Sequence, residues 1–278
     1  MNSGKDNYPR LCRSSISLGV LTFSLCRVLF LEPVQEVHAG ADVQSVSCSS
    51  PSSEPLFKLT PKQLSISLWA REVVAEKVGG KVPRQNTRNL DTLYGEAAVA
   101  DKNLKKKTRA IAENTGGTAF FPPGGGLKGR KRAREKIEVE LGGDASSLMD
   151  ISRSSIEYDN VDQVYQALEF ILHQGYEVVR VKDRALDPLH SGFWDIHLNL
   201  SMPNGHIAEL QLHLKEIRQY SILKGHDLYE KIRDMEAGAV RDNRQLTLEE
   251  QATIDHFNCE QRRVYRAAFQ RGQKGKDR

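Results

Sequence analysis

Acid, amide and imidazole side chains alternate with apolar ones in the segment SGFWDIHLNLSMPNGHIAELQLHLK, residues 191–215. The polar positions before and after its Pro-Asn-Gly turn signal are Asp195, His197, Asn199, Ser201, Glu209, Gln211 and His213. Alternation with period two is typical of a strand with one buried side, and the turn signal predicts that two such strands pair as a hairpin. The polar groups then share one face of a sheet, which is either an ordinary solvated surface or the floor of a site.

A basic cluster precedes this hairpin in the sequence. The segment LKGRKRAREK, residues 127–136, contains the basic residues Lys128, Arg130, Lys131, Arg132, Arg134 and Lys136. Such a cluster is either the solvated face of a helix or a binding site for phosphate groups. Arg180 and Lys182, two residues apart, are expected on one face of a later strand.

Two carboxylates on separate strands, Asp150 and Glu209, complete a set that suits the chemistry of Mg²⁺ and nucleotides. Mg²⁺ is commonly held by one or two carboxylates together with phosphate oxygens, and cations stabilise the charge that develops during phosphoryl transfer. The sequence has neither a Walker motif nor the protein-kinase signature set. These residues therefore indicate a nucleotidyltransferase-like or pyrophosphokinase site.

The composition limits the classes of protein and site that the chain can form. The chain has 278 residues, 39% of them hydrophobic, which is enough for a substantial core. A net charge of +4 is too small to make the whole molecule a general nucleic-acid binder. The four cysteines lack the paired spacing of a zinc site.

The pattern of apolar residues and breakers predicts a mixed α+β fold, with a sheet of four or five strands packed on helices. Helices are expected at about 61–78, 90–114 with a break at Gly95, 129–141, 161–173, 215–235 and 248–269. Strands are expected at about 147–159 and 176–184, followed by the two strands of the hairpin. Thr60, Asp159 or Asn160, and a Thr247–Glu250 capping box are predicted to begin three of the helices. The Gly/Pro-rich stretch 115–126 is predicted to be a loop.

The amino-terminal region reads as a targeting segment. Basic residues precede an apolar stretch at 16–31, and small residues follow at 38–41. Arg27 within the apolar stretch argues against a stable membrane span, because an arginine at the centre of a span costs roughly 2.5 to 3.5 kcal/mol. A secretory signal, an organellar transit peptide and a misassigned start all remain open.

The stretch from about 127 to 233 resembles the synthetase domain of RelA/SpoT-type alarmone synthetases, which have a nucleotidyltransferase-like fold. The basic segment LKGRKRAREK is similar to the family's Arg/Lys motif, and LMDISRSSI to the strand with its metal-binding aspartate. SGFWDIHLNL resembles Gly-Tyr-x-x-x-His, and AELQLHLK resembles the Glu-x-Gln strand. The order and spacing agree over about 105 residues. The resemblance implies transfer of pyrophosphate from Mg-ATP to the 3′-hydroxyl of a guanine nucleotide, which is GTP diphosphokinase activity and part of the stringent response.

The resemblance also implies roles for individual residues. Asp150 and Glu209 would be catalytic and would hold Mg²⁺. Nucleotide binding would fall to Lys128, Arg130, Arg132, Lys136, Arg153, Phe193, His197 and Gln211. Phe193 would stack on the acceptor base in place of the family's tyrosine. The chain departs from the family pattern at Arg153, Ser155, Asp195 and His213.

A division of the chain follows from these features. We expect a targeting segment at 1–41, a Ser/Pro-rich linker at 42–56, a helical lead-in with a Gly/Pro loop at 57–126, the synthetase-like domain at 127–236, and a C-terminal helix with a basic tail at 237–278. The expected ligands are ATP and a nucleotide acceptor, with GDP or GTP favoured.

The departures keep two alternatives open. The same fold could modify an adenine nucleotide or the 3′ end of tRNA as a toxin-like enzyme, and the basic tail and the segment KNLKKKTR at 102–109 would favour RNA. Alternatively, the domain could bind a nucleotide or a partner protein without catalysis. A homo-oligomer is compatible with either alternative.

Overall fold

The computed structural model of the protein describes residues 55–122 and 126–274. All described residues belong to one compact unit. The expected targeting segment and most of the expected linker lie outside the described residues. No helix within the described ranges is both long and apolar enough to cross a membrane.

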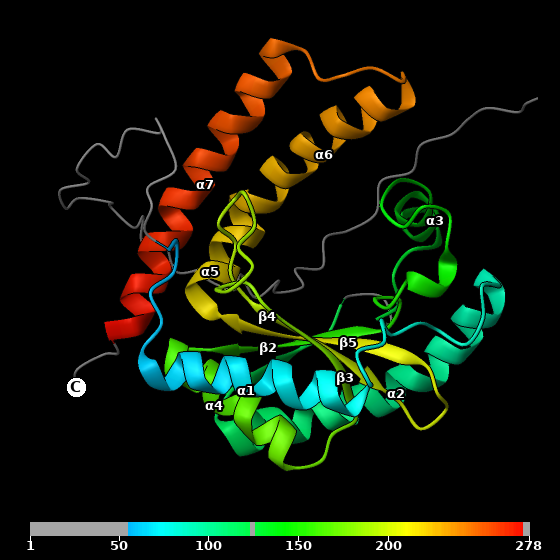
Figure 1. Ribbon diagram of the computed structural model, residues 1–278, viewed down its shortest axis with the longest axis vertical. Coiled ribbons are helices and arrows are strands. Elements are labelled where there is room, and N and C mark those ends of the chain that lie inside the picture. The colour runs from blue at the N-terminus through cyan, green and yellow to red at the C-terminus, as the bar shows by residue number, and fades with distance from the viewer. Residues whose placement is uncertain (1–54, 123–125, 275–278) are drawn as a thin grey trace, which may run out of the picture. The chain divides into compact units, whose positions relative to one another are not determined.

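A five-stranded mixed sheet organises this unit, with strand order β1-β2-β5-β4-β3 (Figure 1). The strands are β1 (Thr118–Phe120), β2 (Arg153–Tyr158), β3 (Val178–Asp183), β4 (Ile196–Ser201) and β5 (Ile207–Leu214). β2 pairs in parallel with β5, and the other neighbouring strands are antiparallel. The predicted hairpin is confirmed as β4–β5, with Gly205 of the turn in the left-handed region at φ 79°. The α+β architecture predicted from the sequence is therefore confirmed.

Helices cover the sheet unequally. They are α1 (Pro61–Lys77), α2 (Leu90–Thr115), α3 (Arg130–Val139), α4 (Val161–His173), α5 (Lys215–Tyr220), α6 (His226–Arg241) and α7 (Leu248–Lys274). A π-helical turn, Ser221–Gly225, joins α5 to α6. In Figure 1, α1, α2 and α4 lie on one side of the sheet, whereas α3 and α6 lie on the other. The sheet therefore has one face buried by helices and another face available for polar groups.

The three N-terminal helix caps predicted from the sequence are present. Thr60 and Asn160 begin α1 and α4, each in a capping box with a glutamine at the third helical position. The Thr247 backbone and hydroxyl pair with Glu250 at the start of α7, as predicted. Asn89 caps α2 by accepting from the Thr92 amide.

Two hydrophobic clusters stabilise this arrangement. The larger joins the buried face of the sheet to α1, α2, α4 and α7, including Ile66, Leu104, Leu168, Leu210 and Phe269. The smaller joins the start of α2 to α3 and to the segment before β2. The second cluster matters for the site because it anchors the backbone on both sides of Asp150.

Three details of the predicted elements are wrong. Gly95 does not break α2, because one exposed glycine costs only about 1 kcal/mol and the helix buries Leu93, Ala97 and Leu104 around it. The predicted loop at 115–126 contains β1, which is too short to show an alternating pattern. Asp150 precedes β2 instead of lying within a strand, because a 3₁₀ turn, Ala145–Ser147, occupies the preceding residues.

Candidate functional site

Polar side chains from four neighbouring strands occupy the sheet face opposite α1, α2 and α4. Register places Arg153 beside Glu209, Gln211 beside His197, and His197 beside Lys182. Because residues directly opposite each other in a sheet project to the same side, these groups share one surface. We call this surface the site face and define it by Arg153, Ser155, Glu157, Arg180, Lys182, Arg184, Asp195, His197, Asn199, Glu209, Gln211 and His213.

A closed network of polar contacts crosses the centre of the site face. His197 Nε2 lies 2.6 Å from Asp195 Oδ2, and His197 Nδ1 lies 3.5 Å from Glu209 Oε2. The Gln211 amide donates to Glu209 Oε1 at 2.6 Å, and Gln211 Oε1 lies 3.1 Å from His213 Nε2. His213 Nδ1 returns to within 3.7 Å of Asp195 Oδ2. Glu209 is therefore held through both of its oxygens.

The charges of this network differ between its two histidines. Burial lowers the pKa of His197, but the Asp195 carboxylate, with Glu209 beyond it, outweighs burial and leaves the pKa raised. Burial lowers the pKa of His213 to about 3, with too little compensation from Asp195. Burial would raise the pKa of Asp195, but the charge and hydrogen bond of His197 lower it overall. His213 is thus neutral at pH 7, whereas the pair of Asp195 and His197 favours opposite charges.

Asp150 is held by two lysines from the basic cluster. Lys128 Nζ and Lys136 Nζ each donate to Asp150 Oδ2 at 2.8 Å. Burial opposes the charge of this carboxylate, but the two lysines outweigh it and lower the Asp150 pKa to about 2. The Lys128 backbone is fixed as well, because its amide donates to Ile151 and its carbonyl accepts from the Tyr94 hydroxyl. Asp150 Oδ1 is buried and has no hydrogen-bond partner within the described chain.

The structure brings the Asp150 cluster and Glu209 to the same region. The Glu209 amide donates to the Ser152 carbonyl at 3.0 Å, two residues beyond Asp150. Burial lowers the pKa of Lys136, yet Asp150 and, more weakly, Glu209 raise it overall. The charge of Lys136 is therefore stabilised by Asp150 and Glu209, the two carboxylates predicted from the sequence to form the site.

Cations of β3 form a row at the edge of the site face. Burial and the nearby charge of Arg184 lower the pKa of both Arg180 and Lys182, Arg180 adds to the effect on Lys182, and Glu209 only partly compensates. Arg184 continues the row, and its amide donates to the Asp195 carbonyl. Within residues 55–122 and 126–274, neither Arg180 nor Lys182 forms an ion pair. Half-buried cations without anionic partners favour binding of an anion.

Several buried polar atoms near this face have no partner among the described residues. They are Asp150 Oδ1, Arg184 Nε, Asp195 Oδ1, His213 Nδ1 and Arg218 Nε. Buried polar groups are normally hydrogen-bonded, since an unpaired one costs about 1 to 3 kcal/mol. Their concentration here is consistent with a surface that water or a ligand completes.

Other predicted site residues lie differently. Arg130 stacks over the Tyr94 ring and pairs with Asp91, and Arg132 pairs with Glu135 and Glu140, so neither contacts Asp150 or Glu209. Phe193 is half-buried beside the site face.

Phe193 makes edge contacts with the His213 and Tyr265 rings, with centroid distances of 6.0 and 5.4 Å. Trp194 is fully buried in the core, and its indole donates to Asp183. Trp194 is therefore part of the hydrophobic core.

Sequence reasoning assigned no role to Asp195, Arg180, Lys182 or Arg184. Asp195 was placed on the polar face of the hairpin and differs from the family pattern, but a single sequence does not show that its side chain bonds the histidine two residues later. The shared face of Arg180 and Lys182 was visible from their spacing, but not that both face Glu209.

Metal binding at this site would depend on a small donor set. The described residues contain no group of three or more His, Cys, Asp or Glu side chains that could hold a metal ion. Asp150 and Glu209 offer two carboxylates, and the unpaired Asp150 Oδ1 is suited to a hard cation. These residues fit an ion that is bound together with phosphate oxygens.

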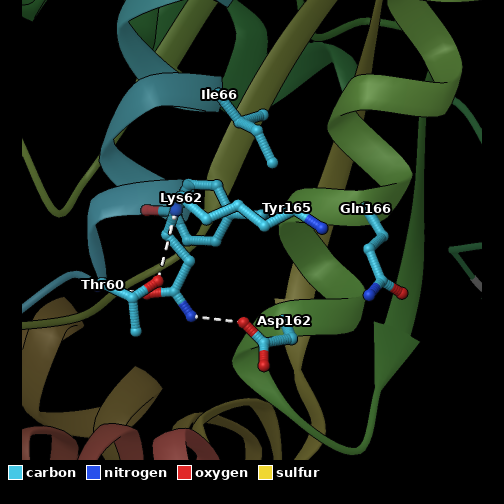
Figure 2. A pocket seen from close by; sticks show the side chains of 7 residues that line it. Thr60, Lys62, Ile66, Asp162, Tyr165 and Gln166 are labelled. Atoms are coloured by element: carbon cyan, nitrogen blue, oxygen red, sulfur yellow. Dashed lines mark hydrogen bonds between the residues drawn. The ribbon is translucent and has the colours of Figure 1, made fainter.

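A small cavity lies away from the site face, between α1 and α4 (Figure 2). Its volume is about 230 Å³, and Ile66, Tyr165, Gln63 and Asp162 are among its lining residues. The Gln63 amide donates to Asp162 at 2.7 Å, and the Tyr165 hydroxyl donates to Asp183. A cavity of this size is below the range of pockets that enclose ligands the size of a nucleotide.

Comparisons with known proteins agree with the motifs. No protein-family model matches the sequence. The chain is 26% identical over 150 residues to the (p)ppApp synthetase toxin Tas1 of Pseudomonas aeruginosa, a match that covers 51% of this chain and 33% of Tas1. The matched region thus spans about a third of that relative's length.

The chain is also similar to several solved structures. The Tas1 chain in a complex of this type VI effector with its immunity protein matches with 21% identity and a TM-score of 0.49, covering 69% of this chain and 99% of that one. A GTP pyrophosphokinase family protein from Streptococcus pneumoniae has 16% identity and a TM-score of 0.49, with coverage of 69% and 94%. Small alarmone synthetase 1 from Bacillus subtilis has 15% identity and a TM-score of 0.42, with coverage of 64% and 92%. The sequence match to a (p)ppApp synthetase confirms the predicted resemblance to alarmone-type synthetases.

Proposed function

We propose that the protein is a pyrophosphokinase that transfers pyrophosphate from Mg-ATP to the 3′-hydroxyl of a purine nucleotide. The observation that carries this proposal is the position of Glu209, a carboxylate held by His197 and Gln211 and faced by the cations Arg180 and Lys182. A fixed carboxylate among unpaired cations suits a reaction in which a hydroxyl loses a proton while phosphate charge is neutralised.

The donor nucleotide is assigned to the Asp150 side of the site. Lys128 and Lys136 already bind one carboxylate oxygen there, and a triphosphate offers them stronger acceptors. Asp150 and Glu209 would hold Mg²⁺, with Arg153 beside Glu209 on the neighbouring strand. The ion would supply charge neutralisation on the phosphate oxygens.

Glu209 is the candidate general base. Its two oxygens contact His197 and Gln211, so the carboxylate does not need to reorient before it accepts a proton. This role requires the acceptor hydroxyl within about 3 Å of the carboxylate in the bound complex. The β3 cations would bind the acceptor's own phosphates, and the Phe193 ring would stack on its base.

Two acceptor classes are candidates. A guanine nucleotide, GDP or GTP, follows from the family resemblance in the motifs. An adenine nucleotide is the second candidate, because Tas1, the curated relative that matches by sequence, is a (p)ppApp synthetase. Asp195 and His213 differ from the family pattern, so the pattern does not decide between a guanine and an adenine base.

The test is a transfer assay with the full chain. Mg²⁺ and γ-labelled ATP are supplied with GDP, GTP, AMP, ADP, ATP or tRNA as acceptor, and labelled products are separated by chromatography. Glu209→Gln is the test variant. Glu76→Gln, on an exposed position of α1, is the matched control for the same chemical change.

We expect one purine nucleotide to become labelled by the wild-type chain and by Glu76→Gln, but not by Glu209→Gln. Equal turnover in both variants would remove Glu209 from the mechanism. Labelling of tRNA alone would replace the nucleotide acceptor with RNA. Binding of ATP without any labelled product would reduce the domain to a nucleotide-binding module.

A further inference from the structure

Asp195 is a carboxylate with no exposed surface, immediately before β4. A buried charge costs several kcal/mol of solvation free energy unless a partner compensates it. Among the described residues, the Asp195 carboxylate has one hydrogen bond, the 2.6 Å contact of His197 Nε2 with Oδ2. Oδ1 has no hydrogen-bond partner in the described part of the chain. The main partner of the Asp195 carboxylate is therefore the His197 imidazole.

The opposite nitrogen of that imidazole faces the candidate base. His197 Nδ1 lies 3.5 Å from Glu209 Oε2, while Gln211 donates to Glu209 Oε1. A carboxylate that accepts from one ring nitrogen fixes both the orientation of the ring and the position of its other nitrogen. Asp195, His197 and Glu209 thus form one line of contacts across two strands.

The surroundings of Asp195 restrict its movement. His213, fully buried, lies 3.7 Å away through Nδ1, and its Nε2 is 3.1 Å from Gln211 Oε1. The Arg184 amide donates to the Asp195 carbonyl, which fixes the backbone. Rotation of the carboxylate away from His197 would therefore require movement of buried neighbours.

We propose that Asp195 is a positioning residue that holds the His197 ring against Glu209 and thereby fixes the orientation of the Glu209 carboxylate. The catalytic part of this inference rests on the proposed role of Glu209 as a base. Asp195 is a fully buried member of the site face and acts through His197, so substrate does not need to touch it.

A spectroscopic experiment tests the positioning without any turnover. The full chain is labelled with ¹⁵N-histidine, and long-range ¹H–¹⁵N spectra record both ring nitrogens, with His197→Gln used for assignment. Asp195→Ala removes the acceptor. Asp195→Asn keeps an oxygen that can accept from Nε2, which makes it the variant expected to retain fold and geometry.

The matched control is Asp183→Asn, because Asp183 is equally buried but lies on the other side of the sheet. Its carboxylate accepts from Ser67, Tyr165 and Trp194, none of which belongs to the site face. This control measures the general effect of neutralising a buried carboxylate. We expect it to lower stability but to leave the His197 signals and kcat unchanged.

We expect the His197 ring signals to move in Asp195→Ala and in Glu209→Gln, and to move less in Asp195→Asn. In the transfer assay, Asp195→Ala should lower kcat by about 10- to 100-fold, as for other outer-sphere partners of a functional histidine, with KM for ATP within about twofold. Asp195→Asn should recover part of the loss.

The two parts of the inference fail separately. Unchanged His197 signals in both Asp195 variants would overturn the positioning. Moved signals with unchanged kcat would overturn the connection to catalysis. If the wild-type chain labels no acceptor, the proposed function fails, and the His197 signals still decide whether Asp195 holds this ring against Glu209.

Discussion

Lys136 Nζ donates to Asp150 Oδ2 at 2.8 Å, and Lys128 binds the same oxygen at the same distance. The two lysines proposed to bind ATP phosphates therefore donate hydrogen bonds to the carboxylate that is proposed to bind Mg²⁺. Asp150 Oδ1 is the oxygen left without a partner in the described structure. Nucleotide and ion are thus expected to bind together, because phosphate oxygens can draw the lysines away from Asp150.

The first prediction concerns Lys136→Met. Loss of a charge-assisted contact of about 1.5 to 3 kcal/mol should weaken ATP binding by roughly 10- to 100-fold. Calorimetric titration with a non-hydrolysable ATP analogue and Mg²⁺ measures the effect. Lys131→Met, which removes an exposed lysine from the same helix, is the control and should bind like the wild type. Equal affinity in both variants would exclude Lys136 from the donor site.

A second prediction concerns the β3 cations. Lys182→Gln should raise KM for the acceptor and reduce its dependence on salt, because one phosphate-facing charge is lost. The same change should leave the unfolding free energy equal or slightly higher, since burial and the neighbouring arginines Arg180 and Arg184 already disfavour the charge of Lys182. Urea unfolding and steady-state kinetics measure the two quantities. Lys81→Gln, on an exposed position outside the sheet, provides the control. A stability loss with an unchanged KM would show that Lys182 is structural.

The sequence predicted which residues share the sheet face, but not the hydrogen bonds and ion pairs between their side chains. Period-two alternation was sufficient to place Glu209, Gln211 and His197 on one surface, because side-chain direction in a strand follows from spacing alone. The contact between Asp195 and His197 depends on rotamers and burial, which spacing does not determine. Arg130 and Arg132 were grouped with Lys128 and Lys136 by proximity in sequence, yet they project from α3 toward partners of their own.

A third prediction is a pH dependence of stability. Burial lowers the pKa of His206 to about 4, and neither ring nitrogen has a hydrogen-bond partner in the described structure. The unfolded chain therefore takes up this proton first, so the contribution of His206 to the unfolding free energy is highest above pH 6.5 and falls as pH decreases toward 4. The loss is up to roughly 3 kcal/mol at about 1.36 kcal/mol per pKa unit.

Unfolding in urea at several pH values measures this slope. His206→Gln should flatten the slope between pH 6.5 and 4, while His213, whose pKa is about 3, continues to contribute in the same direction. Glu96, 3.8 Å from His206, is the carboxylate that would stabilise the protonated ring. The exposed His256→Gln should retain the wild-type slope. An unchanged slope in His206→Gln would mean that His206 is protonated without cost in the folded state.

The fourth prediction uses two glycines near α2. A methyl group at Gly95 meets no atom within 4 Å, so Gly95→Ala should raise the unfolding free energy by about 0.5 to 1 kcal/mol through helix propensity. A methyl group at Gly117 would lie 2.5 Å from Ile156 and 2.6 Å from Tyr158, so Gly117→Ala should lower it by about 1 to 3 kcal/mol.

These opposite signs test the corrected part of the fold. If Gly95 interrupted the helix, Gly95→Ala would change little, because an alanine in a loop gains no helical stabilisation. If β1 did not pair with β2, the chain at Gly117 could move away from Ile156, and Gly117→Ala would be tolerated. Chemical unfolding of both variants beside the wild type therefore decides whether α2 is continuous at Gly95 and whether β1 pairs with β2 at the edge of the sheet.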